Sequence, residues 1–200
     1  MYDSTIFNRY INEIGDPKIQ EIVEECLQKC PKEFYTMPAS TTGKYHPPFA
    51  LGEGGLVRHT LAACCWAKDL LQLEQYSILL PKADYILAAL ILHDSVKKGF
   101  GKSKYTVFEH PIYAAKLVTN VCEELAETNG SRRYIECGAI ISRLIASHMG
   151  QWNRAFNSNV TLPKPKSDIQ QFVHLCDYLA SRKGDPDVYI NSSAGSEQEI

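Results

Sequence analysis

Apolar residues recur every three to four positions through most of the chain, which is the spacing of an amphipathic α-helix. Between Pro17 and Cys30, for example, Ile19, Ile22 and Val23 fall on one helical face. Alternation of the kind that marks β-strands is sparse. The pattern predicts an all-α domain, a bundle of about six helices, over residues 17–30, 55–73, 83–98, 111–127, 132–148 and 168–182.

Residues at the helix ends support these boundaries. Asp16 and Pro17 are suited to the N-cap and first position of a helix, and Ser167 with Gln170 forms a capping-box pattern. Gly99 is a natural stop for the third helix, and His110 stands at the N-cap position of the fourth.

Two long connections and a tail lack the apolar period. The segments are 32–54, rich in Pro, Gly and Thr, and 150–166. Long loops in compact domains are usually functional, so we expect the first to be ordered. We assign residues 1–183 to one domain and residues 184–200 to a flexible tail that is dispensable for folding.

Composition narrows the class of protein. Of the 200 residues, 21 are Lys or Arg and 23 are Asp or Glu, giving a net charge of −2, so strong non-specific binding of nucleic acid is not expected. The longest apolar run, Tyr85 to Leu92, falls far short of the roughly 20 residues that span a bilayer, and no signal peptide is visible. We therefore expect a cytoplasmic protein without a membrane partner.

The seven cysteines do not form a spaced disulfide framework. Cys26 and Cys30 have i,i+4 spacing that suits either a metal or two buried thiols on one helix face. Because no second Cys/His pair lies nearby, we favour buried thiols.

Five histidine and aspartate residues continue the apolar rows of the predicted helices, or lie at their starts. An ionised carboxylate on such a row costs several kcal/mol unless it is paired, and few Lys or Arg share these faces. A divalent metal bound by these imidazoles and carboxylates would supply the missing positive charge. A mixed set of nitrogen and oxygen ligands suits Mn²⁺, Fe²⁺, Co²⁺, Ni²⁺ or Zn²⁺ better than Mg²⁺. Separate core histidines and N-caps are the alternative. The residues are His59, His93, Asp94, His148 and Asp177, with His110 at the fourth helix's start.

The order of these residues, with their flanking motifs, resembles the HD-domain superfamily of metal-dependent phosphohydrolases. The motifs are GGLVRHTL, AALILHDSVKKG, EHPIYAA, LIASHMG and HLCDYLASRK, and the resemblance covers about residues 38–183. It implies that His59, His93, Asp94 and Asp177 bind one metal and that His110 and His148 serve a second. Met149, and Ser95-Val96 after the doublet, depart from the usual pattern without removing a ligand.

The upstream stretch PASTTGKYHPPFALGEGGLVRHTL is similar to the HD domain attached to certain 3′-to-5′ exoribonucleases and to stand-alone phage and bacterial relatives. The nucleic-acid-binding domain of those longer enzymes has no room in this chain. By this resemblance the protein can also be phage-encoded and act in a bacterial cytoplasm.

Two metals can activate a water and clamp a phosphoryl group. We expect Asp94 to bridge them, since a carboxylate has two oxygens whereas an imidazole has one free lone pair. Lys97 lies one turn from Asp94 and is predicted to orient it or to stabilise phosphate charge; a cation that simply suits the helix C-terminus is the alternative.

Candidate substrate residues lie in the flanking loops. Lys98 and Lys102 belong to the acid-free run KKGFGKSK, which lacks the spacing of a P-loop. Trp152 is a candidate for base stacking and Arg154 for phosphate binding. His46 is a pocket residue by resemblance only, and His174 is expected to support the site rather than to ligate metal.

The sequence thus predicts a phosphohydrolase, with a metal-activated hydroxide cleaving a phosphoester or phosphoanhydride in a nucleotide or short oligonucleotide. A catalytically silent module that senses a nucleotide or partner protein, and a di-iron oxygenase on the same fold, are alternatives. A homo-oligomer stays open.

Overall fold

The computed structural model describes residues 2–41, 46–101 and 103–182. In this part of the chain seven α-helices and four 3₁₀ helices occur and no strand, so the predicted all-α class is confirmed. Arg154 and Thr161 form an isolated β-bridge. The predicted tail, 184–200, and residues 183 and 102 lie outside the described residues.

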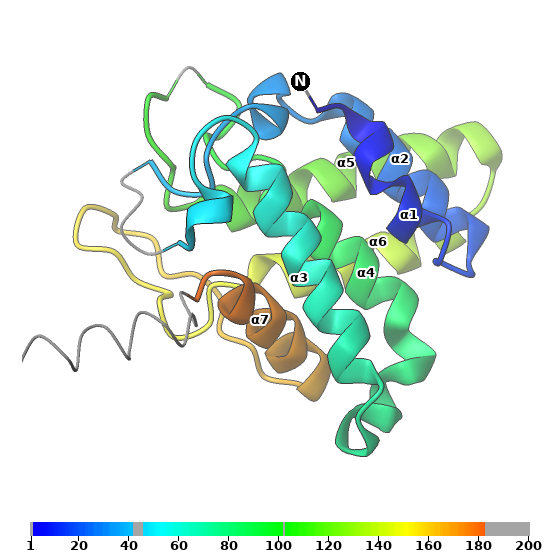
Figure 1. Cartoon of the computed structure of the whole chain (residues 1–200). Helices are drawn as coiled ribbons and strands as arrows, with labels where there is room; N and C mark the ends of the chain where they lie inside the picture. The colour runs from blue at the N-terminus through cyan, green and yellow to red at the C-terminus, as the bar shows by residue number, and fades with distance from the viewer. Residues whose placement is uncertain (1, 42–45, 102, 183–200) are drawn as a thin grey trace, which may run out of the picture.

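The helices form a bundle around α4 (Figure 1). The α-helices are α1 (Asn8–Ile11), α2 (Pro17–Lys29), α3 (Gly55–Leu71), α4 (Ala83–Leu92), α5 (His110–Asn129), α6 (Arg133–Ala146) and α7 (Asp168–Ala180). The 3₁₀ helices are η1 (Ser4–Phe7), η2 (Lys32–Tyr35), η3 (Pro48–Ala50) and η4 (Glu74–Lys82). The predicted long loop over 32–54 therefore carries two short helical turns.

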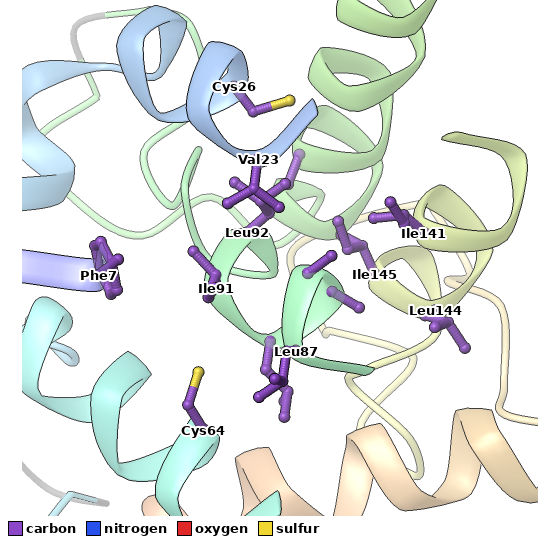
Figure 2. Packing of buried hydrophobic residues seen from close by; sticks show 14 of the residues in the cluster. Phe7, Val23, Cys26, Cys64, Leu87, Ile91, Leu92, Ile141, Leu144 and Ile145 are labelled. Atoms are coloured by element: carbon purple, nitrogen blue, oxygen red, sulfur yellow. The ribbon is translucent and has the colours of Figure 1, made fainter. Parts of the chain in front are cut away.

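Helix α4 is central because it is apolar on every side. Each residue from Ile86 to Leu92 is buried, and the helix packs against α2, α3, α6 and α7. Figure 2 shows side chains of α4 such as Ile91 within one apolar core that also receives Val23 of α2 and Ile145 of α6. A helix that is apolar all round can only be accommodated in such a position.

The segment Glu74–Leu92 passes a test of length and composition for a membrane-crossing helix, with a mean hydropathy of 1.2. It consists of η4 followed by α4, however, and the α4 part forms the core. A core helix passes the same test.

The predicted caps are present, and two predicted boundaries are wrong. Asp16 caps α2 through the backbone N–H of Lys18, and Ser167 with Gln170 forms the capping box of α7. The helix predicted over 83–98 ends at Leu92, where a series of tight turns begins, and Gly99 instead adopts a positive φ within those turns. His110 is the first residue of α5 and Glu109 its N-cap, because the His110 ring turns inward instead of capping the helix.

Candidate metal centre

The six predicted ligands come from five helices and meet in the interior. His59 lies on α3 and Asp177 on α7, while the other four stand at helix ends: His93 and Asp94 directly after α4, His110 at the start of α5 and His148 just after α6. The five other than Asp177 are buried almost completely, and the Asp177 side chain is 19% exposed. Three overlapping groups of these residues have ligand atoms within 4.8 Å of one another.

One side of the cluster joins two histidines and two carboxylates. The Nε2 atom of His59 lies 2.9 Å from Oδ1 of Asp177 and 3.9 Å from Oδ2 of Asp94. The Nε2 atom of His93 lies 3.5 Å and 3.4 Å from the same two oxygens.

The other side joins Asp94 to the remaining two histidines. Its Oδ1 atom lies 3.0 Å from Nε2 of His110 and 3.6 Å from Nε2 of His148, and the two Nε2 atoms are 3.3 Å apart. The two oxygens of Asp94 therefore face different groups of ligands. This is the position that a carboxylate bridging two ions needs.

Three of the histidines are oriented by the same local bond. The Nδ1 atom lies 2.6–2.8 Å from the carbonyl oxygen three residues earlier, which is Leu90 for His93, Val107 for His110 and Ile145 for His148. At the ends of α4 and α6, this bond satisfies carbonyls that lack a helical N–H partner. It also assigns the proton to Nδ1, so that in the neutral ring Nε2 presents a lone pair to the cluster.

This arrangement fits a metal because acceptors converge without a donor on the side of His110 and His148, whereas Oδ2 of Asp94 is bonded by Lys97 and Asp177 by His59. Between His110 and His148, two Nε2 lone pairs and Oδ1 of Asp94 point at one another. Neither Nε2 of His93 nor Oδ1 of Asp94 has a hydrogen-bond partner in the described part of the chain. Buried acceptors facing one another are costly unless a cation lies between them.

The pKa values follow from burial and from the neighbouring charges. Burial lowers the pKa of His148 to about 3 and also lowers that of His110, so both rings are neutral at pH 7. Burial opposes protonation of His93, but the carboxylates of Asp94 and Asp177 outweigh it and raise its pKa to about 10. The pKa values of both carboxylates lie well below their ordinary range, because the adjacent cationic and imidazole groups outweigh burial. Without a metal, a proton on His93 partly takes its place.

Lys97 and His46 lie beside the cluster. The Nζ atom of Lys97 is 2.5 Å from Oδ2 of Asp94, and its side chain is 11% exposed. The His46 ring centroid lies 5.0 Å from that of His59, and its buried Nδ1 atom has no hydrogen-bond partner among the described residues. Burial and the nearby His59 lower the pKa of His46 to about 4. Both side chains therefore lie at the edge of the His/Asp cluster.

Sequence reasoning missed Arg58, which fixes the segment after His46. Its guanidinium donates to the carbonyl oxygens of Phe49, Leu51 and Glu53 at 2.5–2.9 Å. The position next to His59 in GGLVRHTL was the available signal.

The remaining candidates lie further out. Trp152 is 44% exposed and stacks on Tyr178 at 5.6 Å, so one of its faces is already covered. Arg154 is exposed and Lys98 is partly buried; the side chain of neither makes a hydrogen bond or ion pair with another described residue. Lys102 lies outside the described residues. The Nδ1 atom of His174 is 2.7 Å from the carbonyl oxygen of His148, so His174 supports the chain at a ligand.

Cysteine takes no part in the metal-binding groups found in the described residues. Cys26 is buried in the core, and Cys30 donates its S–H to the carbonyl oxygen of Leu27. These are the buried thiols that the sequence favoured.

Comparison with known proteins identifies the family. The family model for the HD domain matches residues 56–182, which is more than half of the chain and contains all six clustered residues. Comparisons with curated proteins and with solved structures gave no match. The matched span and the buried His/Asp cluster agree, and the chain therefore belongs to the HD-domain superfamily of metal-dependent phosphohydrolases.

Proposed function

We propose that this protein is a metal-dependent phosphohydrolase that cleaves a phosphoester or phosphoanhydride of a nucleotide or short oligonucleotide. The observation that carries the proposal is the position of Asp94, whose Oδ2 lies near His59 and His93 and whose Oδ1 lies near His110 and His148 within one continuous cluster. A site for a single ion would not need both groups.

The chain's own residues suit two divalent ions. His59, His93, Asp94 and Asp177 would hold one, and Asp94, His110 and His148 would hold the other. Two ions bound there would lower the pKa of a water that attacks phosphorus and would neutralise the phosphoryl charge. The imidazole-rich set favours Mn²⁺, Fe²⁺, Co²⁺, Ni²⁺ or Zn²⁺ over Mg²⁺.

Lys97 would act at the same site in two ways. Its ammonium holds Oδ2 of Asp94, which fixes the carboxylate between its two groups of neighbours. Because the side chain also reaches solvent, it offers positive charge to an incoming phosphate. His46, neutral at pH 7, would supply a hydrogen bond to the phosphate or leaving group.

The nucleotide part of the proposal rests on the loops around the centre. Lys98 and Arg154 supply local positive charge to a chain whose net charge is −2, and Trp152 presents an aromatic face; Lys102 stays a candidate from the sequence alone. A phosphate joined to a stacking base would engage both. The small basic footprint favours a nucleotide or short oligonucleotide over a long nucleic acid.

The test is a hydrolysis screen of the Mn²⁺-reconstituted protein against nucleotides, dinucleoside polyphosphates, cyclic oligonucleotides and short RNA or DNA. Turnover should disappear in Asp94→Asn, because the amide loses the charge that faces both groups. Asp69→Asn, an exposed aspartate on α3, is the matched control and should keep wild-type rates.

Full activity in Asp94→Asn would refute the assignment of the site. Binding of nucleotides without turnover of any of them would instead establish a silent sensor module.

A further inference from the structure

A groove of about 590 Å³ lies between η4 and the outer face of α7, outside the metal cluster. Its walls carry aromatic and aliphatic side chains, among them Tyr76, Phe172 and Tyr178. The Tyr76 and Phe172 rings pack edge to face with centroids 4.9 Å apart; because Phe172 is almost fully buried, Tyr76 is the accessible ring of this wall. Its volume falls within the roughly 300–1,000 Å³ typical of small-molecule sites.

Three primary amides converge on this groove, from Gln75 on η4, Gln151 in the loop after α6 and Gln171 on α7. None of these side chains hydrogen-bonds to another described residue, and neither do the hydroxyls of Tyr76 and Tyr178. Each amide offers both a donor and an acceptor. The groove thus combines aromatic walls with unused groups that can hydrogen-bond in either direction.

The fixed charge of the lining itself is negative. Among the described residues that line the groove, Asp168 carries the only fixed charge and no Lys or Arg is present, while the Arg182 guanidinium lies over the ring of Tyr178, 4.4 Å from its centroid. A phosphate in the groove would meet the Asp168 carboxylate. The ligand that fits is neutral or weakly basic, planar, and bordered by donors and acceptors.

Nucleobases have this chemistry. Their faces stack on aromatic side chains, and a side-chain amide pairs with the donor and acceptor on the edge of adenine through two parallel hydrogen bonds. The three glutamines are exposed, so their amides can exchange water for the edge of such a ring, whereas an aliphatic chain offers them no donor or acceptor.

The groove also adjoins the metal centre. His174, which lines the groove, donates from Nδ1 to the carbonyl oxygen of the ligand His148. Its ring lies so close to Gly150 that an added Cβ would come within 2.3 Å of it. The groove is thus linked through the His174 ring to the backbone of His148.

From these observations we propose that the groove between η4 and α7 binds the nucleobase of a nucleoside or nucleotide. This deepens the proposed function and rests on it only for the identity of the attached phosphate. The base belongs either to the substrate itself or to a separate nucleoside effector, and both have the same groove chemistry.

The first experiment measures nucleoside binding without any phosphate. Adenosine, guanosine, cytidine, uridine and thymidine are titrated into the metal-reconstituted Trp66→Phe protein by calorimetry, with fluorescence of Trp152 as a local probe. Trp152 stacks on Tyr178 of the groove, so occupancy should change its emission. At least one nucleoside should bind saturably.

Variants then place the binding in the groove. Gln75→Ala and Gln171→Ala should each raise the nucleoside Kd roughly three- to tenfold, the effect of losing one or two hydrogen bonds. Gln72→Ala, an exposed glutamine just after α3 that does not line the groove, is the matched control and should leave Kd unchanged. All three positions are exposed, so folding should be preserved.

Kinetics separates the two sources of the base. If the base is the substrate's, the free nucleoside competes with the best nucleotide substrate and the two groove variants raise KM by the same factor as Kd. If it belongs to an effector, the nucleoside changes kcat without competing.

Absence of saturable binding by all five nucleosides would overturn the proposal, as would binding that Gln75→Ala and Gln171→Ala leave intact. The same titration on Asp94→Asn makes the measurement of binding independent of hydrolysis, because that variant needs no turnover to report binding.

Discussion

Replacing Gly150 with alanine tests how the chain supports the ligand His148. Gly150 has a φ of +57°, which costs a residue with a Cβ about 1–2 kcal/mol. The new Cβ would also lie 2.3–2.6 Å from three atoms of the His174 ring, so the ring must move. This movement breaks the 2.7 Å hydrogen bond to the carbonyl of His148, at a further cost of about 1–2 kcal/mol.

The total loss in the free energy of unfolding is then about 2–4 kcal/mol. For a protein of this size it corresponds to a decrease in Tm of roughly 4–16 °C, measurable by calorimetry or circular dichroism. Gly130→Ala is the matched control. Gly130 has a φ of +62° with nothing within 4 Å, so this variant should show only the backbone share.

A double-mutant cycle assigns the difference. In a His174→Ala background, Gly150→Ala should lower the free energy of unfolding only by the backbone share. The share that comes from the clash with the His174 ring should vanish, because the ring is gone. Metal affinity should decrease in Gly150→Ala and stay unchanged in Gly130→Ala. Equal melting temperatures for the two glycine variants would refute the argument that His174 packing supports the centre.

Three further predictions concern metal, pH and thiols. Chelation with verified metal loss should lower Tm, because the buried carboxylates and imidazole lone pairs lose their cation; an unchanged melt would contradict a buried centre. In the metal-free protein, the folded-state pKa values of His148 and His46, about 3 and about 4, lie below the ordinary 6.5, so their stabilisation is complete above pH 6.5 and is lost as the pH falls. The pKa of His93, about 10, lies above the ordinary value, so its stabilisation is complete below pH 6.5 and is lost as the pH rises. The free energy of unfolding, measured with denaturant, should therefore be highest near pH 6.5. A flat profile from pH 5 to 9 would count against these pKa values. Cys65 is the one exposed thiol among the seven, whereas burial raises the pKa of the Cys30 thiol to about 11. Native protein should therefore show one fast-reacting thiol in a thiol-labelling assay, and denatured protein seven. Several fast-reacting thiols in the native protein would contradict the buried core.

Much of the fold could be predicted because its signals are local. Asp16 with Pro17, and Ser167 with Gln170, act within one helical turn and leave the same mark in sequence and structure. The even apolarity from Ile86 to Leu92 likewise indicates a helix at the centre of a bundle.

The end of α4 could not be predicted because the apolar period continues past it. Val96 keeps the row buried, but the ring of His93 bonds to the carbonyl of Leu90, and the chain leaves the helix in turns. That change brings Lys97 against Asp94 at i,i+3. The spacing of apolar residues indicates which positions are buried, and residues in a buried turn can keep the same spacing as residues in a helix.

For the site, the sequence named candidate residues and the structure shows how they are grouped. Inward-facing rows singled out His93, Asp94 and Asp177, but the position of the two oxygens of Asp94 among the imidazoles depends on five helices meeting. The groove beside α7 had no sequence signal, because its amides come from three separate segments.

Metal content after reconstitution and removal of free ion tests the central claim most directly. Elemental analysis should find transition metal approaching two ions per chain in the wild type, as a two-metal site requires. His110→Ala should retain about half of that, since it removes one of the three residues proposed for the second ion and leaves the four proposed for the first, His59, His93, Asp94 and Asp177, in place. A wild-type protein without metal, or a His110→Ala variant with the full wild-type content, would contradict the account.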